Sequence, residues 1–320
     1  MSADLWSLSD LCTPWCVHVV ATLRIAEFIS EGKSEIGELA EAARCDRYAL
    51  HAMLGHLVSK GVFEEPEFGR FALNDAARQF LDPGARLGLN LDGLGGRMAH
   101  AWGTMLTYVR TGRSGYAEIF GRPFFDDLDA NAEIGAEFDA LIGPAGHGTP
   151  RGDFELSDGW ADVRHVVDVG GGTGAMLAEI LRLHPGVRGT LVDRPQTVSR
   201  SGAILDKFRD RVTISGQSFF DLLPAGADVY VLRGILNDWP DAEAVAILRR
   251  CAEAAGEKGR VVILGGVREG RMGLVIEMIL LGGKHRSVDE MRALAREAGL
   301  DVLSAGRQAS GYFVTECRRA

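Results

Sequence analysis

The spacing of apolar residues follows two different patterns along the chain, and the first pattern covers residues 1–85. Here apolar residues recur every three or four positions, a period that predicts short amphipathic helices. The segments with this pattern are an apolar run over 17–28, a helix over 34–43 and a helix over 47–60. Ser34 is a suitable N-cap for the second segment, and Gly61 ends the third. Residues 62–73 then predict a small hairpin, so the whole region is typical of a winged helix-turn-helix.

The second pattern begins near residue 155, where short runs of β-branched residues alternate with helical segments. The runs that predict strands are 166–169, 189–193, 227–232 and 260–264. Alternating strands and helices predict an α/β fold with a doubly wound, largely parallel sheet. Apolar residues around Val302 and at 313–314 predict an antiparallel pair at the end. The residues in between have the spacing of connecting helices, so we expect three segments, 1–85, 86–154 and 155–320.

The most informative part of this second region is the glycine loop that follows its first predicted strand. Asp168 in that strand is followed by Gly170, Gly172 and Gly174, and a helical segment comes next. Strand, glycine turn and helix in this order bring a nucleotide-like ligand against bare backbone. The spacing is G-x-G-x-G, whereas dinucleotide-binding dehydrogenases use G-x-G-x-x-G. The difference favours S-adenosylmethionine, which has no phosphate to hold.

Polar residues also follow the next strands of the predicted sheet. Asp193 ends the second strand about twenty residues past the glycine loop, where a carboxylate can bind both ribose hydroxyls. A later apolar strand leads into Arg233 and then into Asn237, Asp238 and Trp239. Because the carboxyl ends of parallel strands meet at one edge of a sheet, these side chains predict a ligand site along that edge.

Several short motifs in a fixed order identify the family that the chain resembles. They are Val-Asp-Val-Gly-Gly-Gly-Thr-Gly (167–174), Leu-Val-Asp-Arg-Pro (191–195), Phe-Phe-Asp-Leu-Leu-Pro (219–224), Asn-Asp-Trp-Pro-Asp (237–241) and Gly-Gly-Lys-His-Arg-Ser (282–287). The chain resembles the small-molecule O-methyltransferases that combine a winged-helix dimerisation domain with a class I S-adenosylmethionine-dependent methyltransferase domain, as plant phenolic and actinobacterial antibiotic-tailoring enzymes do. The resemblance implies that 1–85 forms a homodimer, that 86–154 lines the acceptor pocket, and that 155–320 is the Rossmann-like domain that binds S-adenosylmethionine.

The resemblance also implies which residues bind the cofactor and the acceptor. The expected cofactor-binding residues are Asp168, Gly170, Gly172, Asp193, Arg194, Gln217, Ser218, Phe219 and Arg233. Gln217 and Ser218 stand where the family often has an aspartate that accepts from the adenine amine, and either side-chain oxygen can accept that hydrogen bond. The expected acceptor contacts are Trp102, Met105, Phe124, Asp238 and Trp239. The first three can equally be core residues, because an aromatic stripe more often packs in a core than lines a ligand site.

The chain departs from the plant enzymes at each of the three positions that handle the acceptor's proton. In those enzymes a histidine directly precedes the Asp-Trp pair and is held by two acidic residues. Here Asn237, Gly265 and His285 stand in those places. Asparagine has no basic nitrogen, so Asn237 can orient an acceptor but cannot take its proton. His285 is either a base that acts from the other side of the pocket or a histidine with no catalytic role.

Two activities fit a chain that keeps the cofactor motifs and lacks the usual base. The first is O-methylation of an acidic hydroxyl on an aromatic natural product, which needs alignment rather than a strong base, and a carboxylate or an enolised carbon fits the same logic. The second is other chemistry on retained S-adenosylmethionine, such as hydroxylation, dehydration or a pericyclic reaction. A DNA-binding regulator is a third interpretation, which is disfavoured because the predicted recognition helix carries only Arg47, Lys60 and two histidines.

Composition narrows the partners and the compartment. The 320 residues carry a formal net charge of −9, which favours neither nucleic acid nor an anionic membrane as a partner. We recognise no secretion signal and no apolar run of membrane-spanning length, and we expect a cytoplasmic enzyme. The five cysteines form no C-x-x-C pair, so we expect no metal site, and Cys12 and Cys16 are expected to be buried free thiols on one helix face. His147, in a Gly/Pro-rich segment, is expected to be solvated.

Overall fold

The computed structural model describes residues 4–142, 150–270 and 273–320, and it contains two compact units, residues 1–100 and 101–320. The boundary expected at residue 85 falls within the first unit and the one at 154 within the second, so the division into three segments stays a prediction. His147 lies outside the described residues. Within the described ranges, no helix combines the length and the apolar character that a membrane span needs.

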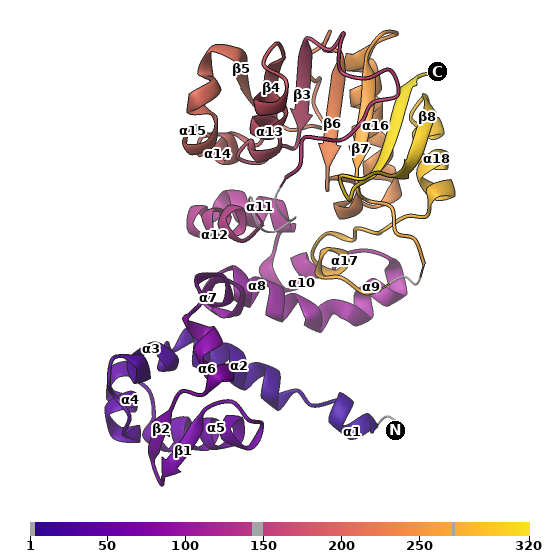
Figure 1. Cartoon of the computed structure of the whole chain (residues 1–320). Helices are drawn as coiled ribbons and strands as arrows, with labels where there is room; N and C mark the ends of the chain where they lie inside the picture. The colour runs from indigo at the N-terminus through magenta and orange to yellow at the C-terminus, as the bar shows by residue number, and fades with distance from the viewer. Residues whose placement is uncertain (1–3, 143–149, 271–272) are drawn as a thin grey trace. The chain divides into compact units, whose positions relative to one another are not determined.

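The first unit is mostly helical and carries one small antiparallel sheet (Figure 1). Its elements are α1 (Leu5–Leu8), α2 (Cys12–Thr22), α3 (Ile25–Ser30), α4 (Ile36–Ala43), α5 (Arg47–Ser59), β1 (Glu64–Glu67), β2 (Arg70–Ala72), α6 (Asp75–Arg78), η1 (Gln79–Leu81), α7 (Pro83–Leu89) and α8 (Leu94–Ala101), which ends at the unit boundary. Apolar side chains of α2 to α5 form its core together with Phe63 and Phe71 of the hairpin. The pairing of β1 with β2 confirms the predicted hairpin.

Two helix bounds of the first unit differ from the sequence pattern. The run over 17–28 covers the end of α2 and most of α3, because the chain breaks at Arg24, which has a φ of +57°. Local capping explains the second difference, the start of α4. The prediction of Ser34 as an N-cap is wrong, because α4 begins after Glu35. The carboxylate of Glu38 accepts hydrogen bonds from the backbone N–H groups of Ser34 and Glu35, at 3.4 and 3.3 Å. An acidic side chain in the first turn thus satisfies the free N–H groups, and no hydroxyl cap is needed.

The cysteines are less uniformly buried than expected. Cys251 and Cys317 are buried, and Cys16 and Cys45 are partly buried. Cys12 is exposed, so the expectation of a buried thiol is wrong there. The reason is its place at the first residue of α2, ahead of the part of that helix that packs into the core.

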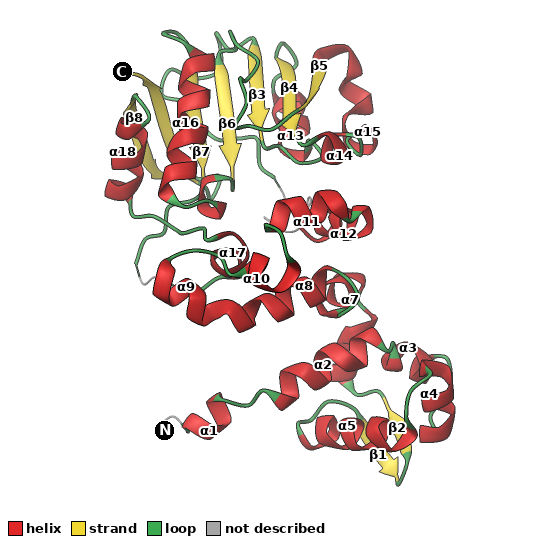
Figure 2. Ribbon diagram, turned by 180° about the vertical axis from the view of Figure 1, so that it is seen from behind, coloured by secondary structure: helices red, strands yellow, loops and turns green. Residues whose placement is uncertain are grey.

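The second unit contains a seven-stranded sheet with helices on both faces (Figure 2). Its elements before the sheet are η2 (Trp102–Thr104), α9 (Met105–Thr111), α10 (Tyr116–Phe120), α11 (Phe124–Ala130) and α12 (Ala132–Ile142). The elements that follow are β3 (His165–Val169), α13 (Ala175–Leu183), β4 (Arg188–Asp193), α14 (Pro195–Val198), α15 (Gly202–Leu205), η3 (Asp206–Arg211), β5 (Val212–Gly216), β6 (Val229–Arg233), η4 (Leu236–Asp238), α16 (Asp241–Ala255), β7 (Arg260–Leu264), α17 (Ile276–Leu281), α18 (Val288–Glu297), β8 (Leu300–Arg307) and β9 (Phe313–Arg319).

Alternate residues of the central strands enter two separate cores. Val167 of β3 packs with α16 and α18 on one face, whereas Val166 packs with α13 on the other. A strand that is buried on both faces reads as a continuous apolar run, which is why β3, β6 and β7 stand out in the sequence. The predicted α/β fold with a doubly wound sheet is therefore confirmed.

The strand order β5-β4-β3-β6-β7-β9-β8 places β3 beside both β4 and β6. These strands run parallel, and β9 is antiparallel to β7 and to β8, which confirms the predicted terminal pair. The chain passes from β3 to β4 on one side of β3, and later returns to form β6 on the other side. Open α/β sheets bind ligands at such a switch point, outside the carboxyl ends of the strands.

Candidate functional site

The glycine loop between β3 and α13 is held in a conformation that favours glycine. Gly170, Gly172 and Gly174 have φ angles of +69°, +61° and +90°. A Cβ at Gly170 would lie 2.5 Å from the Ile235 side chain, and one at Gly174 would lie 2.5 Å from Leu205. At Gly172 no heavy atom of the described residues lies within 4 Å of such a Cβ, so this glycine faces open space. The loop thus presents bare backbone to a ligand.

A cavity of about 460 Å³ lies beside this loop, within the size range of small-molecule pockets. All nine residues that the sequence predicted for cofactor binding line it, and we call them the cofactor wall: Asp168, Gly170, Gly172, Asp193, Arg194, Gln217, Ser218, Phe219 and Arg233. Asp238 and Trp239 also line it. The cavity therefore brings together residues from the ends of four neighbouring strands.

Asp193 ties the end of β4 to the glycine loop. Its Oδ2 accepts from the Gly172 backbone N–H at 2.8 Å, and its Oδ1 accepts from the Arg194 backbone N–H at 2.7 Å. Burial raises the pKa of this carboxyl, against these two donors, which lower it. Two backbone N–H groups thus fix the orientation of the Asp193 carboxylate without a ligand. A carboxylate that binds ribose hydroxyls needs such a fixed orientation.

Asp168 leaves one oxygen without a partner in the wall of the cavity. Its Oδ2 accepts from the Leu177 N–H at 3.2 Å, whereas no described residue bonds Oδ1. Burial raises the pKa of Asp168 to about 7, although the nearby Arg233 guanidinium lowers it. A buried polar atom without a partner is costly and is usually explained by function. A cationic or hydrogen-bond-donating ligand would satisfy this oxygen.

The charge of the cavity wall also favours a cationic ligand. Six aspartates line the cavity, against the two guanidinium groups of Arg194 and Arg233. Asp126, Asp129 and Asp139 among them belong to α11 and α12, and sequence reasoning missed all three. The Arg194 guanidinium pairs with Asp129 at 2.6 Å, and the Arg233 Nε donates to the Tyr312 hydroxyl at 3.0 Å, so both cations already have partners in the protein. Burial holds Asp168 and Asp238 toward their neutral forms, so these two offer hydrogen-bonding oxygens more than charge, and the other carboxylates are the ones that can attract the sulfonium and ammonium groups of S-adenosylmethionine.

Aromatic side chains form a shelf around Trp239. Phe125 stacks on Trp239 with ring centroids 5.6 Å apart and planes 24° apart. Phe219 and Phe220 meet the same indole edge-on, at 5.8 and 5.0 Å. All four line the cavity and form what we call the aromatic shelf. It gives this part of the cavity an apolar, aromatic wall against which a planar ligand group can pack.

The segment after β5 is held largely by its own hydrogen bonds. Gln217 Oε1 accepts from the Ser215 hydroxyl at 2.7 Å, and its Nε2 donates to the Leu222 carbonyl at 2.8 Å. The Ser218 hydroxyl accepts from the Phe220 N–H at 3.2 Å. Each of the two oxygens accepts one hydrogen bond from the protein and keeps a second lone pair, so either can still accept from an adenine amine.

A second group of polar residues gathers around η4 and α17, and we call it the acceptor side: Asn237, Asp238, Glu277 and His285. Of these four, Asp238 lines the cavity, and the contact of the others with an acceptor stays a prediction. The Asn237 amide donates to Asp238 Oδ1 at 3.0 Å. Burial, together with the Glu277 carboxylate, raises the pKa of Asp238 well above its usual range. Glu277 lies on α17, which packs against η4, η2 and α9. Sequence reasoning missed its role, and its only signal is a lone charge in an apolar run.

His285 is held in a neutral form with one nitrogen unused. Burial lowers its pKa, and so does the Arg268 guanidinium, whereas the Glu277 carboxylate opposes them. Among the described residues, none bonds its Nδ1, although that atom is buried. A neutral imidazole with a free nitrogen is able to accept a proton.

Arg286 and Gly283 fix the segment that carries His285 against η4. The buried Arg286 guanidinium donates to the carbonyls of Leu236 and Trp239, at 2.6 and 2.8 Å, and pairs with Asp241. A Cβ at Gly283 would clash with the Asn237 carbonyl. The close approach therefore depends on glycine, and Arg286 is a positioning residue that the motif 282–287 contained but did not reveal.

The remaining residues expected to touch the acceptor lie in different surroundings. Phe124 is buried and meets Tyr116, Phe125 and Phe138 edge-on, so its neighbour Phe125 is the one that lines the cavity. Trp102 is exposed, and Met105 begins α9, which packs against α17. Their contact with an acceptor stays a prediction.

Comparison with known proteins defines the class, a methyltransferase that uses S-adenosylmethionine. Residues 102–301 match the O-methyltransferase domain model, so the chain belongs to that family. It is 37% identical to the 2,7-dihydroxy-5-methyl-1-naphthoate 7-O-methyltransferase of Streptomyces carzinostaticus, over 94% of this chain and 93% of that protein. It is 35% identical to the aclacinomycin 10-hydroxylase RdmB of Streptomyces purpurascens, over 94% and 84%.

The structural comparison supports the same class. The O-methyltransferase NcsB1 of neocarzinostatin biosynthesis, crystallised with S-adenosylmethionine and 2-hydroxy-5-methyl naphthoic acid, matches with a TM-score of 0.86. The two chains are 34% identical, and the match covers 100% of this chain and 99% of that one. The expected fold, family, cofactor and enzyme class are thus confirmed.

Proposed function

We propose that this enzyme methylates an acidic hydroxyl group of an aromatic natural product. The observation that carries the proposal is the aromatic shelf beside the cofactor wall, because aromatic side chains in a cavity wall suit a planar aromatic acceptor. Two similar proteins support it: one is named for a dihydroxynaphthoate, and NcsB1 was crystallised with a hydroxynaphthoic acid. The net charge of −9 and the many carboxylates of the cavity do not favour a polyanionic acceptor.

The chain's own residues have to align the acceptor oxygen and exclude water. S-adenosylmethionine, when bound, supplies a methyl group already activated by its sulfonium. The glycine loop and Asp193 would hold that cofactor, and the cofactor wall lies next to Asp238 and Trp239. Trp239 and its aromatic neighbours would cover the reacting centre, while the Asn237 amide orients the acceptor hydroxyl. Good alignment alone supplies much of the rate in such a displacement.

The acceptor's proton has a route that needs no strong base. An acidic phenol is partly ionised near neutral pH, so it needs less help than an ordinary phenol. Asn237 cannot accept a proton, but the neutral His285 has a buried Nδ1 that no described residue bonds. We assign His285 as the group that receives the proton, and Asn237 as the group that orients the oxygen.

A second activity is favoured by one specific comparison. The relative RdmB is named a hydroxylase although it is 35% identical over 94% of this chain. Chemistry other than methyl transfer therefore occurs on this scaffold in at least one named relative. The missing histidine base of this chain is compatible with that alternative, in which retained S-adenosylmethionine acts through its charge.

We further propose that the first unit mediates homodimerisation and that the enzyme is cytoplasmic. Large apolar side chains at its start are exposed: Leu5, Trp6, Leu8 and Leu11. Exposed apolar clusters of this kind mark interaction surfaces. The few basic groups of α5 and of Lys60, which directly follows it, are partly engaged, since His51 lies 2.9 Å from Glu65 and Lys60 lies 3.3 Å from Asp10. A nucleic-acid interface is therefore not proposed.

The decisive experiment is incubation with S-adenosylmethionine labelled in its methyl group and a series of hydroxynaphthoates and simpler phenols of graded acidity. We expect label in the product, with rates that rise as the acceptor's pKa falls. A matched series of methyl-blocked acceptors is the control and should take up no label. Tight cofactor binding without transfer to any acceptor would contradict methylation and favour the hydroxylase alternative.

A further inference from the structure

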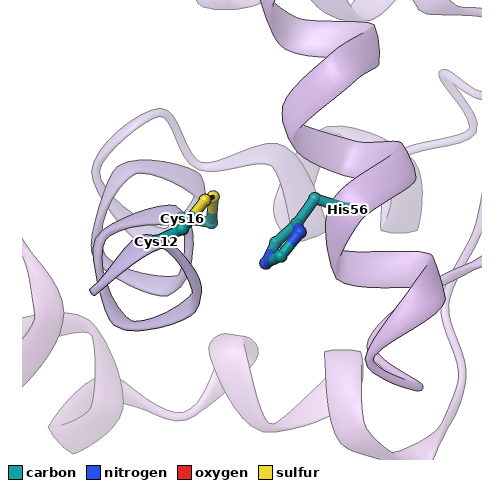
Figure 3. A group of neighbouring side chains, drawn as sticks. All are labelled: Cys12, Cys16 and His56. Atoms are coloured by element: carbon teal, nitrogen blue, oxygen red, sulfur yellow. Dashed lines mark hydrogen bonds between the residues drawn. The ribbon is translucent and has the colours of Figure 1, made fainter. Parts of the chain in front are cut away.

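Three side chains meet in the first unit, far in sequence from the cofactor wall. Cys12 and Cys16 lie one turn apart on α2, and His56 lies on α5. Figure 3 shows the His56 imidazole extending from its helix toward the two sulfur atoms. One donor atom from each residue lies within 4.8 Å of the others. Methyl transfer uses none of the three, so the proposed function leaves this cluster unexplained.

The separation of the two sulfur atoms matches that of two thiolates on one tetrahedral metal ion. The two sulfur atoms are 3.8 Å apart. With Zn–S bonds of about 2.3 Å in tetrahedral geometry, two thiolates on one zinc ion are about 3.8 Å apart. A disulfide would need the sulfur atoms to approach to about 2.05 Å, so the observed spacing is that of two ligands rather than of a bond. The pair is thus already placed for a shared ion.

The surroundings of His56 orient its ring. Its Nε2 lies 2.8 Å from the Thr13 hydroxyl, which in turn donates to Asp10 Oδ2 at 2.6 Å. Asp10 also accepts from the backbone N–H of Cys12 at 2.9 Å, so one carboxylate links both parts of the cluster. Metal-binding histidines are commonly held by such an outer hydroxyl or carboxylate partner. The ring is therefore fixed in place.

We propose that Cys12, Cys16 and His56 form a site for one thiophilic divalent metal ion, with Zn²⁺ as the ion that fits the donor set. Thiolate and imidazole ligands select zinc over magnesium or calcium, which prefer oxygen. Three protein ligands leave the fourth position to water. The ion would join α2 to α5 within the first unit, so its role is to stabilise that unit and not to take part in catalysis.

The test is metal binding by the full-length chain, freed of metal and reduced with a phosphine. We expect one Zn²⁺ per chain in competition with a chromophoric chelator, and a thiolate-to-cobalt charge-transfer absorption when Co²⁺ is used instead. Cys12→Ser should weaken Zn²⁺ affinity by about tenfold or more and reduce that absorption. Because Cys12 is exposed, this variant leaves the core intact. The thermal midpoint of the native chain should rise with added Zn²⁺.

The matched control is Cys45→Ser, which removes a partly buried cysteine of the same unit outside the cluster. It should bind Zn²⁺ as the native chain does. The proposal is overturned if the reduced native chain binds no Zn²⁺ at micromolar concentration, if Cys12→Ser binds it equally well, or if bound Co²⁺ shows no charge-transfer absorption. Affinity for S-adenosylmethionine should be the same in all three proteins, which separates this result from any failure of the proposed function.

Discussion

The cofactor wall and the acceptor side of the second unit are built by different means. In the cofactor wall, backbone groups of the glycine loop meet the Asp193 carboxylate, and the strand ends fix the position of every part. On the acceptor side, Asn237 comes from η4, whereas Glu277 and His285 come from the stretch 276–287. Gly283 and the buried Arg286 hold these two segments together. One region depends on main-chain geometry, whereas the other depends on a few side chains.

This difference explains why the cofactor wall keeps the residues typical of the family, whereas the acceptor side departs from them. Changing a loop glycine or Asp193 disturbs the backbone, so substitutions there should remove cofactor binding altogether. Changing a side chain of the acceptor side leaves the scaffold intact and can adjust the chemistry. Substitutions in the two regions should therefore differ in both size and kind of effect.

The largest effect is expected for Asp193→Ala. Loss of the carboxylate removes the ribose partner and leaves the Gly172 and Arg194 N–H groups without their acceptor. We expect S-adenosylmethionine affinity to fall by about 10³-fold, measured by isothermal titration calorimetry. Asp221→Ala, at an exposed aspartate of the same unit, is the control and should bind normally. Tight binding by Asp193→Ala would refute the site.

Alanine substitutions at two glycines can distinguish a clash with bound ligand from the strain of a left-handed backbone. Gly172 and Gly159 both have positive φ, +61° and +72°, and at neither does a described atom lie within 4 Å of an added Cβ. Only Gly172 lines the cavity. We expect similar losses of thermal stability for Gly172→Ala and Gly159→Ala, of about 1 kcal/mol. Only Gly172→Ala should also lose cofactor affinity, by roughly 10²-fold. Equal affinities would show that the ligand does not reach this loop.

On the acceptor side, His285→Gln should lower turnover rather than cofactor affinity. The native histidine accepts a proton only when neutral, and its pKa lies below 6.5, so native turnover should fall as the pH drops through that lowered value. His285→Gln should be slower by about 10² at neutral pH and should lose this dependence. Rates are compared between pH 5 and 8 at saturating cofactor. An unchanged profile would remove His285 as the base.

The smallest effect is expected for Asn237→Ala. The amide supplies a hydrogen bond for orientation, and the loss of one such bond costs about 1 kcal/mol, or about fivefold in rate. Cofactor affinity should be unchanged. Asn237→Asp keeps the shape but places a carboxylate beside Asp238, so it should be worse than alanine. Complete loss of turnover in Asn237→Ala would show that the alignment mechanism is wrong.

Much of the second unit could be predicted from sequence because its elements are signalled locally. The helix expected to begin at 175 is α13, and the strand expected to end at Asp193 is β4. All nine cofactor residues meet in one cavity because strand ends in a parallel sheet share an edge. Whether Asp193 binds a ribose stays a prediction that the variants above test.

The parts that could not be predicted depend on packing between segments that are distant in sequence. The pattern offered Phe124 for the pocket, yet Phe124 faces a core and Phe125 faces the cavity, because one helical step rotates a side chain by about 100°. Asp126, Asp129 and Asp139 reach the cavity only through the docking of α11 and α12. Glu277 belongs to the acceptor side only through the packing of α17 against η4.

The six aspartates of the cavity also bear on how a catalytic cycle ends. The sulfonium charge disappears when the methyl group leaves, so the spent thioether by-product loses the attraction that retained the fresh donor. Burial raises the pKa of Asp168, Asp193 and Asp238, and these groups ionise more fully as the medium becomes alkaline. The preference for binding the cationic donor over the thioether by-product should then increase. The same carboxylates that favour binding of the donor therefore also favour release of the by-product.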